Sequence, residues 1–147
     1  NNMLGGPGMN ARLNVILRER RGLVYSVESS MVCYGDTGLW SVYFGCDPHD
    51  VNRCVRLVKG EFNRLMEKPL PEKTLAAAKR QIKGQLAVAC DNNENFAIDF
   101  GKSFLHFGDE KDIEKLYQKI DAVTAEQIQQ VAKEIFDKDS LATLVIK

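Results

Sequence analysis

The sequence predicts an α+β protein, in which an antiparallel sheet carries several helices packed on one face. Two segments rich in aromatic and β-branched residues flank a Gly-Asp-Thr-Gly turn at 35–38, a pattern typical of a β-hairpin. Segments with apolar residues every three or four positions lie on both sides of this hairpin, which indicates amphipathic helices. The order is helix, hairpin, several helices and a last strand, so the helices must cover the sheet.

Length and composition indicate one folded domain over residues 1–147. The chain has 20 basic and 20 acidic residues, 44% hydrophobic and 27% charged residues, as in ordinary globular proteins. No apolar run reaches the roughly 18 residues that a membrane span needs. The zero net charge argues against a nucleic-acid partner. We expect a soluble protein, with cytoplasm and periplasm both open.

The first elements can be predicted in chain order. Leu-Gly-Gly-Pro-Gly at 4–8 indicates a flexible or tight-turning segment outside any regular element. A helix follows, and Gly22 stands where a C′ glycine ends a helix. The strands of the hairpin are expected over 23–34 and 39–46. The apolar face of this helix comprises Met9, Leu13, Ile16 and Leu17.

The next helix is predicted to begin with Asp47 as its N-cap and Pro48 as its first residue. Pro69 and Pro71 separate it from a second helix. The stripe of apolar residues expected to pack along the first of these helices comprises Val51, Cys54, Val55, Val58, Phe62, Leu65 and Met66.

The remaining elements follow from breaks in the pattern. Residues 91–94 indicate a break, and Phe96, Phe100, Phe104 and Phe107 mark a further helix up to Gly108. Shorter helices are expected over 110–120 and 125–136, the latter with Thr124 and Gln127 as a capping box. Residues 140–147 resemble a closing strand. Three strands are few for so many helices, so we expect further strands from residues before Asn1.

The chain contains four cysteines, Cys33, Cys46, Cys54 and Cys90. None forms a C-x-x-C pair and no histidine lies near them in sequence, so no zinc-finger spacing exists. In the predicted hairpin Cys33 and Cys46 would each face another residue, which argues against a disulfide between them. We therefore expect buried free thiols.

No residue pattern in the chain is sufficient for bond-breaking chemistry. A zinc peptidase needs H-E-x-x-H or H-x-x-E-H, whereas the two histidines, His49 and His106, are far apart. We therefore assign no metal ligand in this chain. Gly5 to Gly8 before a helix resembles an anion-binding loop but lacks the Gly-Lys-Ser/Thr ending of a phosphate loop.

Arg18 and Tyr25 are the residues that suggest a site. They lie seven positions apart across the glycine turn, so both side chains can reach one edge of the sheet. A guanidinium and a phenol are both donors, and both can hold a carbonyl oxygen as it gains negative charge. The alternative interpretation is an exposed arginine at a helix end and a half-buried tyrosine in the sheet.

Three segments of the sequence resemble a known family. Residues 4–13, 17–27 and 34–48 are similar to the insulinase/pitrilysin-type zinc peptidases, and most similar to their bacterial and mitochondrial processing-peptidase branch. The helical remainder to Lys147 agrees with that branch in order and length. The resemblance therefore covers nearly the whole chain.

The resemblance implies a place within a clamshell of two similar α+β halves that close over an unfolded peptide. The first half carries the H-x-x-E-H zinc site, and the second supplies an arginine and a tyrosine to the scissile carbonyl. This chain resembles the later part of the second half, a fragment of the C-terminal domain, and its Asn-Asn-Met start agrees with a piece of a longer protein. Arg18 and Tyr25 match the arginine–tyrosine pair.

The glycines Gly5, Gly6 and Gly8 match the family loop implicated in substrate contact. No cofactor is implied for this chain, since zinc is expected in the missing half or in a partner. Because the zinc motif is absent, we expect the chain alone to be inactive.

Three functions are consistent with the resemblance. The first is the substrate-binding C-terminal part of a zinc-dependent endopeptidase, with a peptide substrate and the zinc-bearing half as partner. The second is a zinc-free partner subunit of a two-chain peptidase. The third is a non-catalytic structural or peptide-binding member of the family. A ferredoxin-like binding module is the remaining alternative.

Overall fold

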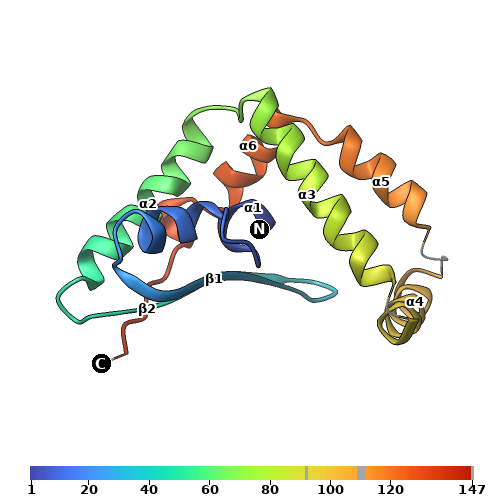
Figure 1. Ribbon diagram of the computed structural model, residues 1–147, viewed down its shortest axis with the longest axis horizontal. Coiled ribbons are helices and arrows are strands. Elements are labelled where there is room, and N and C mark those ends of the chain that lie inside the picture. The colour runs from blue at the N-terminus through green and yellow to red at the C-terminus, as the bar shows by residue number, and fades with distance from the viewer. Residues whose placement is uncertain (92, 109–111, 147) are drawn as a thin grey trace. The chain divides into compact units, whose positions relative to one another are not determined.

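The computed structural model describes residues 1–91, 93–108 and 112–146 (Figure 1). The predicted α+β class is confirmed. The chain divides into two compact units, the hairpin unit (Asn1–Leu70 with Glu126–Lys147) and the helical unit (Pro71–Ala125). In chain order the elements are α1 (Asn2–Gly5), η1 (Asn14–Glu19), β1 (Val24–Cys33), β2 (Gly38–Cys46), α2 (Val51–Glu67), α3 (Glu72–Cys90), α4 (Asn93–Phe107), α5 (Ile113–Ala122), α6 (Ala125–Ile135) and η2 (Lys138–Ser140).

Strands β1 and β2 form the antiparallel hairpin that the sequence predicts. Its register runs from Val24 opposite Cys46 to Cys33 opposite Gly38. Cys33 and Cys46 therefore lie at opposite ends of the ladder, which excludes a disulfide between them. All four cysteines are free, as predicted, but only Cys54 is buried, so the prediction of burial is wrong for the other three.

The first predicted helix is confirmed over a shorter range than expected. Its regular part is the π-helix η1, in which the Arg20 N–H donates to the Val15 carbonyl at 3.0 Å. Leu13, Ile16 and Leu17 are buried as predicted, whereas Met9 is 72% exposed and lies before the helix. The reason is a turn in which the Ala11 N–H donates to the Gly8 carbonyl, so the helix begins later.

Helix α1 is an element that the sequence does not predict. Leu4 and Gly5 belong to it, although the glycine-rich segment indicated irregular structure. Their N–H groups donate to the Asn1 carbonyl, and the Leu4 side chain is buried. The Ser29 hydroxyl of β1 lies 2.6 Å from the Asn1 side-chain oxygen, so packing and hydrogen bonding to the sheet stabilise this single turn.

Two further predicted boundaries are wrong. Asp47 and Pro48 form a turn before α2 and not its first residues, since the Asp50 N–H donates to the Asp47 carbonyl and the helix begins at Val51. Proline suits the second position of such a turn. The predicted closing strand is also absent from the described residues. Residues 141–146 have no regular secondary structure and pair with no strand, residue 147 lies outside the described residues, and Leu144 is 85% exposed.

An aromatic cluster joins the helices of the hairpin unit to the sheet. Helices α1, η1, α2 and α6 lie on one side of the hairpin (Figure 1). The Trp40 ring of β2 lies 5.3 Å from the Phe62 ring of α2 and 4.8 Å from the Phe136 ring that follows α6. The two phenylalanine rings stack at 4.3 Å. Residues of the predicted α2 stripe that are buried comprise Cys54, Val58, Phe62 and Leu65.

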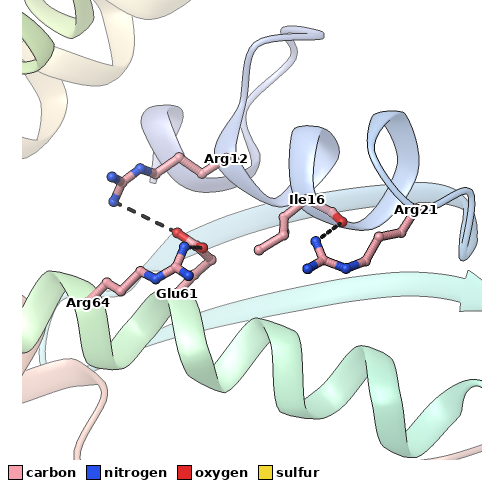
Figure 2. Close-up of polar contacts among 5 residues, drawn as sticks. All are labelled: Arg12, Ile16, Arg21, Glu61 and Arg64. Carbon is pink, nitrogen blue, oxygen red and sulfur yellow. Dashed lines mark hydrogen bonds and ion pairs between the residues drawn. The ribbon is translucent and has the colours of Figure 1, made fainter.

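A buried carboxylate joins the segment before η1 to α2. Glu61 is 4% exposed, and Figure 2 shows it between two arginines. The Arg64 guanidinium lies 2.5 Å from one of its oxygens, and the Arg12 guanidinium lies 3.9 Å from the other. Since an unpaired buried charge is costly, these arginines make the burial of Glu61 tolerable.

Polar contacts join α3 to the last turn of α5 in the helical unit. The Lys83 ammonium of α3 lies 2.5 Å from an Asp121 carboxylate oxygen, and Lys79 donates to the Asp121 carbonyl at 2.7 Å. The predicted break falls between α3 and α4, with residue 92 outside the described residues, as are 110 and 111 of the predicted 110–120 helix. Gly108 ends α4 with a φ of 65°. Among the described residues no helix is long and apolar enough to cross a bilayer.

Replacing either phenylalanine of the aromatic cluster should destabilise the hairpin unit. F62A removes a buried ring that contacts both Trp40 and Phe136, and such truncations cost about 3–5 kcal/mol. The test is urea unfolding followed by the fluorescence of Trp40, the single tryptophan. The matched control L144A, at an exposed position, should change the free energy of unfolding by less than about 0.5 kcal/mol. An equal loss in the free energy of unfolding for F62A and L144A would contradict the placement of Phe62 in this core.

Candidate functional site

Arg18 lies on the outward face of η1. Its neighbours Ile16 and Leu17 are buried, and Leu17 is fully so. Because the helix uses this face to cover β1, the next side chain, Arg18, is exposed. The N–H groups of its guanidinium can therefore donate to a ligand that lies outside the hairpin unit.

A left-handed glycine connects η1 to β1. Gly22 has a φ of 58°, as a C′ glycine requires. Its N–H donates to the Arg18 carbonyl at 2.8 Å, and the Leu23 N–H donates to the Leu17 carbonyl at 2.9 Å. These bonds satisfy the last carbonyls of the helix and turn the chain directly into the strand.

Tyr25 lies at an irregularity in the hairpin. Val24 pairs with Cys46 and Ser26 pairs with Gly45, so Tyr25 is the extra residue of a β-bulge. Bulges redirect side chains and are frequent beside functional sites. The Tyr25 side chain is 76% exposed, and its hydroxyl donates to an Asp47 carboxylate oxygen at 3.3 Å.

The structure therefore places Arg18 and Tyr25 on consecutive elements, both exposed on the two sides of the Gly22 turn. The sequence predicted the turn but not the bulge, and the half-buried tyrosine of the alternative interpretation is not found. A 3.3 Å hydroxyl contact is long for an O–H···O bond, so a carbonyl oxygen of a ligand can replace Asp47. Both residues are donors suited to an oxygen that gains negative charge.

The three predicted glycines lie in and after α1. A Cβ on Gly5 would stand 2.7 Å from the Ser29 nitrogen, and one on Gly6 would stand 2.4 Å from the Asn2 side-chain oxygen. The Gly8 N–H donates to the Gly6 carbonyl at 2.8 Å. Gly5 and Gly6 therefore have a packing reason to be glycine, independent of any ligand.

One group of metal-ligating side chains occurs among the described residues. Asp47, His49 and Asp50 have ligand atoms within 4.8 Å of one another. His49 is exposed, and its Nε2 lies 3.1 Å from an Asp50 oxygen. A single exposed histidine with two aspartates does not fit the paired histidines and glutamate of a zinc peptidase site.

The thiol of Cys54 lies near Asp50, the last residue of the turn at 47–50. Burial raises its pKa to about 11, and a hydrogen bond with the Cys46 thiol adds to this shift. Since the thiolate is the nucleophile, Cys54 is unsuited to covalent chemistry near neutral pH.

Comparisons with known proteins find relatives among peptidases. Residues 1–82 match the peptidase M16 inactive domain. An uncharacterised zinc protease of Streptomyces coelicolor is 30% identical over 138 residues, which are 94% of this chain and 30% of that protein. The mitochondrial-processing peptidase subunit beta of Bos taurus is 32% identical over 142 residues, which are 95% of this chain and 29% of that protein.

A solved structure agrees with the sequence relatives. A conserved protein from Enterococcus faecalis V583 has a TM-score of 0.77 and 27% identity, covering 90% of this chain and 31% of that chain. The chain spans about a third of the length of the relatives it matches.

Substituting Gly5 should test the packing of α1 on β1. G5A places a methyl group against the Ser29 backbone, and such overpacking costs about 1–3 kcal/mol. The matched control is G60A in α2, where a Cβ meets nothing within 4 Å and alanine should stabilise the helix by about 0.5–1 kcal/mol. Thermal unfolding measures both, and a stabilised G5A would contradict the close approach.

Thiol reactivity should follow burial. At pH 8 an alkylating reagent should modify exposed Cys33 first and Cys54 last, because the Cys54 pKa is raised to about 11. The raised pKa also predicts that stability falls as pH rises from 9.0 toward 11, since the unfolded thiol ionises first. Mass spectrometry of alkylated peptides measures the order, with urea-unfolded protein as the control. Equal rates for Cys33 and Cys54 in the folded protein would contradict it.

Proposed function

The chain belongs to the peptidase M16 inactive domain family, and on this basis we propose that it is the substrate-binding part of a zinc-dependent endopeptidase, in which Arg18 and Tyr25 hold the scissile carbonyl. The observation that carries the proposal is the arrangement of these two donors on either side of the Gly22 turn. Tyr25 stands on a β-bulge and Arg18 on the exposed face of η1. Both reach outward from a packed core.

The two side chains would act by electrostatic stabilisation. When a peptide carbonyl becomes tetrahedral its oxygen gains negative charge, and a preorganised guanidinium and phenol lower the energy of that state. The Arg18 backbone is fixed because its carbonyl accepts the Gly22 N–H, and Tyr25 is held between Val24 and Ser26, which both pair with β2. The phenol would leave its long contact with Asp47 and donate to the substrate oxygen.

The metal centre belongs elsewhere in this proposal. The described residues hold no zinc site of the peptidase type, and residues 1–82 match a domain described as inactive. Zinc is expected in another part of the parent chain or on a partner, where it would supply the activated water. The glycine segment 5–8 would line the path of the peptide, since Gly5 packs against β1, the strand that carries Tyr25.

A second candidate is a zinc-free subunit of a two-chain peptidase. It is favoured by the similarity to a protein named as a subunit, the bovine mitochondrial-processing peptidase subunit beta. Under this candidate the zinc-bearing half is a separate polypeptide. Copurification with such a chain supports it, whereas a zinc motif on the same chain supports the single-chain enzyme.

Substitution of the donor pair should reduce catalysis and leave the fold intact. In the complete zinc-bearing enzyme, R18Q or Y25F should lower kcat/KM by about 10- to 1,000-fold, the range for loss of one oxyanion donor. Steady-state hydrolysis of a fluorogenic peptide measures the change. R20Q and Y43F, at exposed positions nearby, are the matched controls and should remain within about threefold.

Near-normal kinetics of both R18Q and Y25F would remove the proposed role. Peptide binding without cleavage, even when the zinc-bearing half is supplied, would instead support a non-catalytic member of the family.

A further inference from the structure

The hairpin unit contains an open hollow that is bordered mainly by arginine residues. It has a volume of about 350 Å³ and lies where the chain leaving η1 faces the first turns of α2. Its lining comprises Arg21, Arg53, Arg56 and Leu57, which we call the arginine hollow. Three arginine side chains thus border one open space.

These arginines are poorly neutralised by the protein itself. The Arg21 guanidinium donates to the Ile16 carbonyl at 3.2 Å and runs back along η1, as Figure 2 shows. Arg53 lies 3.9 Å from Asp50, a carboxylate that also contacts His49. Arg56 makes no ion pair or hydrogen bond with a side chain in the part of the chain that the structure describes.

The contact between α2 and the segment around η1 has a different charge arrangement at its other end. There Glu61 is buried and pairs with Arg12 and Arg64, so the arginines have a carboxylate between them (Figure 2). Among the described residues, no carboxylate lies in the arginine hollow as Glu61 lies between its two arginines. Charges of one sign around a concave wall focus a positive potential, and guanidinium groups bind carboxylates in a paired geometry.

The arginine hollow lies beside the candidate site. Arg21 follows Arg18 by three residues at the end of η1. On the other side, the turn Asp47–Asp50 joins the two places, since Asp47 accepts the Tyr25 hydroxyl and Asp50 contacts Arg53. A peptide held by Arg18 and Tyr25 therefore passes near the hollow.

We propose that the arginine hollow binds the carboxylate of an acidic side chain in an extended peptide, and so selects acidic peptides. The proposal rests on the proposed function, because the peptide is the one that Arg18 and Tyr25 would hold. Arg53 and Arg56 would contact the carboxylate from α2, and Arg21 would close the hollow from the side of η1.

Equilibrium binding tests the arginine hollow directly. The probe is a short alanine peptide with two adjacent glutamates and a neutral fluorophore, and the readout is fluorescence polarisation with the full chain at low salt. The glutamate peptide should bind at least tenfold more tightly than the same peptide with two glutamines. The double variant R53Q/R56Q should lose at least tenfold in affinity, and added salt should weaken the binding of the unmodified protein.

Controls separate this site from net charge and from the donor pair. R20Q removes a neighbouring exposed arginine outside the hollow and should change affinity by less than twofold. A failure of the proposed function would appear in the kcat/KM of R18Q and Y25F in the complete enzyme, whereas a failure of the arginine hollow would appear in the affinity of R53Q/R56Q for the short probe. Unaltered Trp40 fluorescence checks that each variant is folded.

Two results would overturn the proposal. One is equal affinity for the glutamate and glutamine peptides. The other is binding of inorganic phosphate without binding of the glutamate peptide, which would make the hollow a site for free phosphate.

Discussion

The left-handed turn at Gly22 is the constraint on which the candidate site depends. A residue with a Cβ is strained at a φ of 58°, and the two backbone bonds across the turn need this conformation. Through it, η1 folds back over the strand that it precedes, and Leu17 is buried while Arg18 stays exposed. The β-bulge at Tyr25 completes the arrangement. It interrupts the regular alternation of side chains along β1, and the Tyr25 side chain points outward.

The rest of the hairpin unit holds this joint in place. A two-stranded sheet is marginal by itself, so β1 and β2 need the cover of η1, α2 and the aromatic rings around Trp40. Glu61 ties α2 to the segment before η1 by a buried ion pair. At the opposite end of this contact Arg21, Arg53 and Arg56 border one hollow, and the same helices that build the core thereby produce a basic surface.

Local patterns predicted much of this architecture. The hairpin, the glycine at the end of η1, the proline-separated helices and the start of α6 after Thr124 follow from turn chemistry and apolar spacing.

The features that the sequence did not predict have tertiary causes. Leu4 is helical because it is buried and tied through Asn1 to Ser29, which no local pattern contains. The bulge at Tyr25 depends on the register of a partner strand, and the arginine hollow depends on residues about 30 positions apart meeting across η1 and α2. Resemblance to a family supplied the pairing of Arg18 with Tyr25, which spacing alone left open.

In the proposed function, the η1–β1 joint receives a peptide at its scissile bond. The most direct measurement is photocrosslinking in the complete zinc-bearing enzyme, using a non-hydrolysable peptide with a photoreactive residue beside the position of the scissile carbonyl. Mass spectrometry of the adducts should place them on residues 18–25. Adducts confined to the helical unit, Pro71–Ala125, or adducts spread evenly over the surface, would contradict the account.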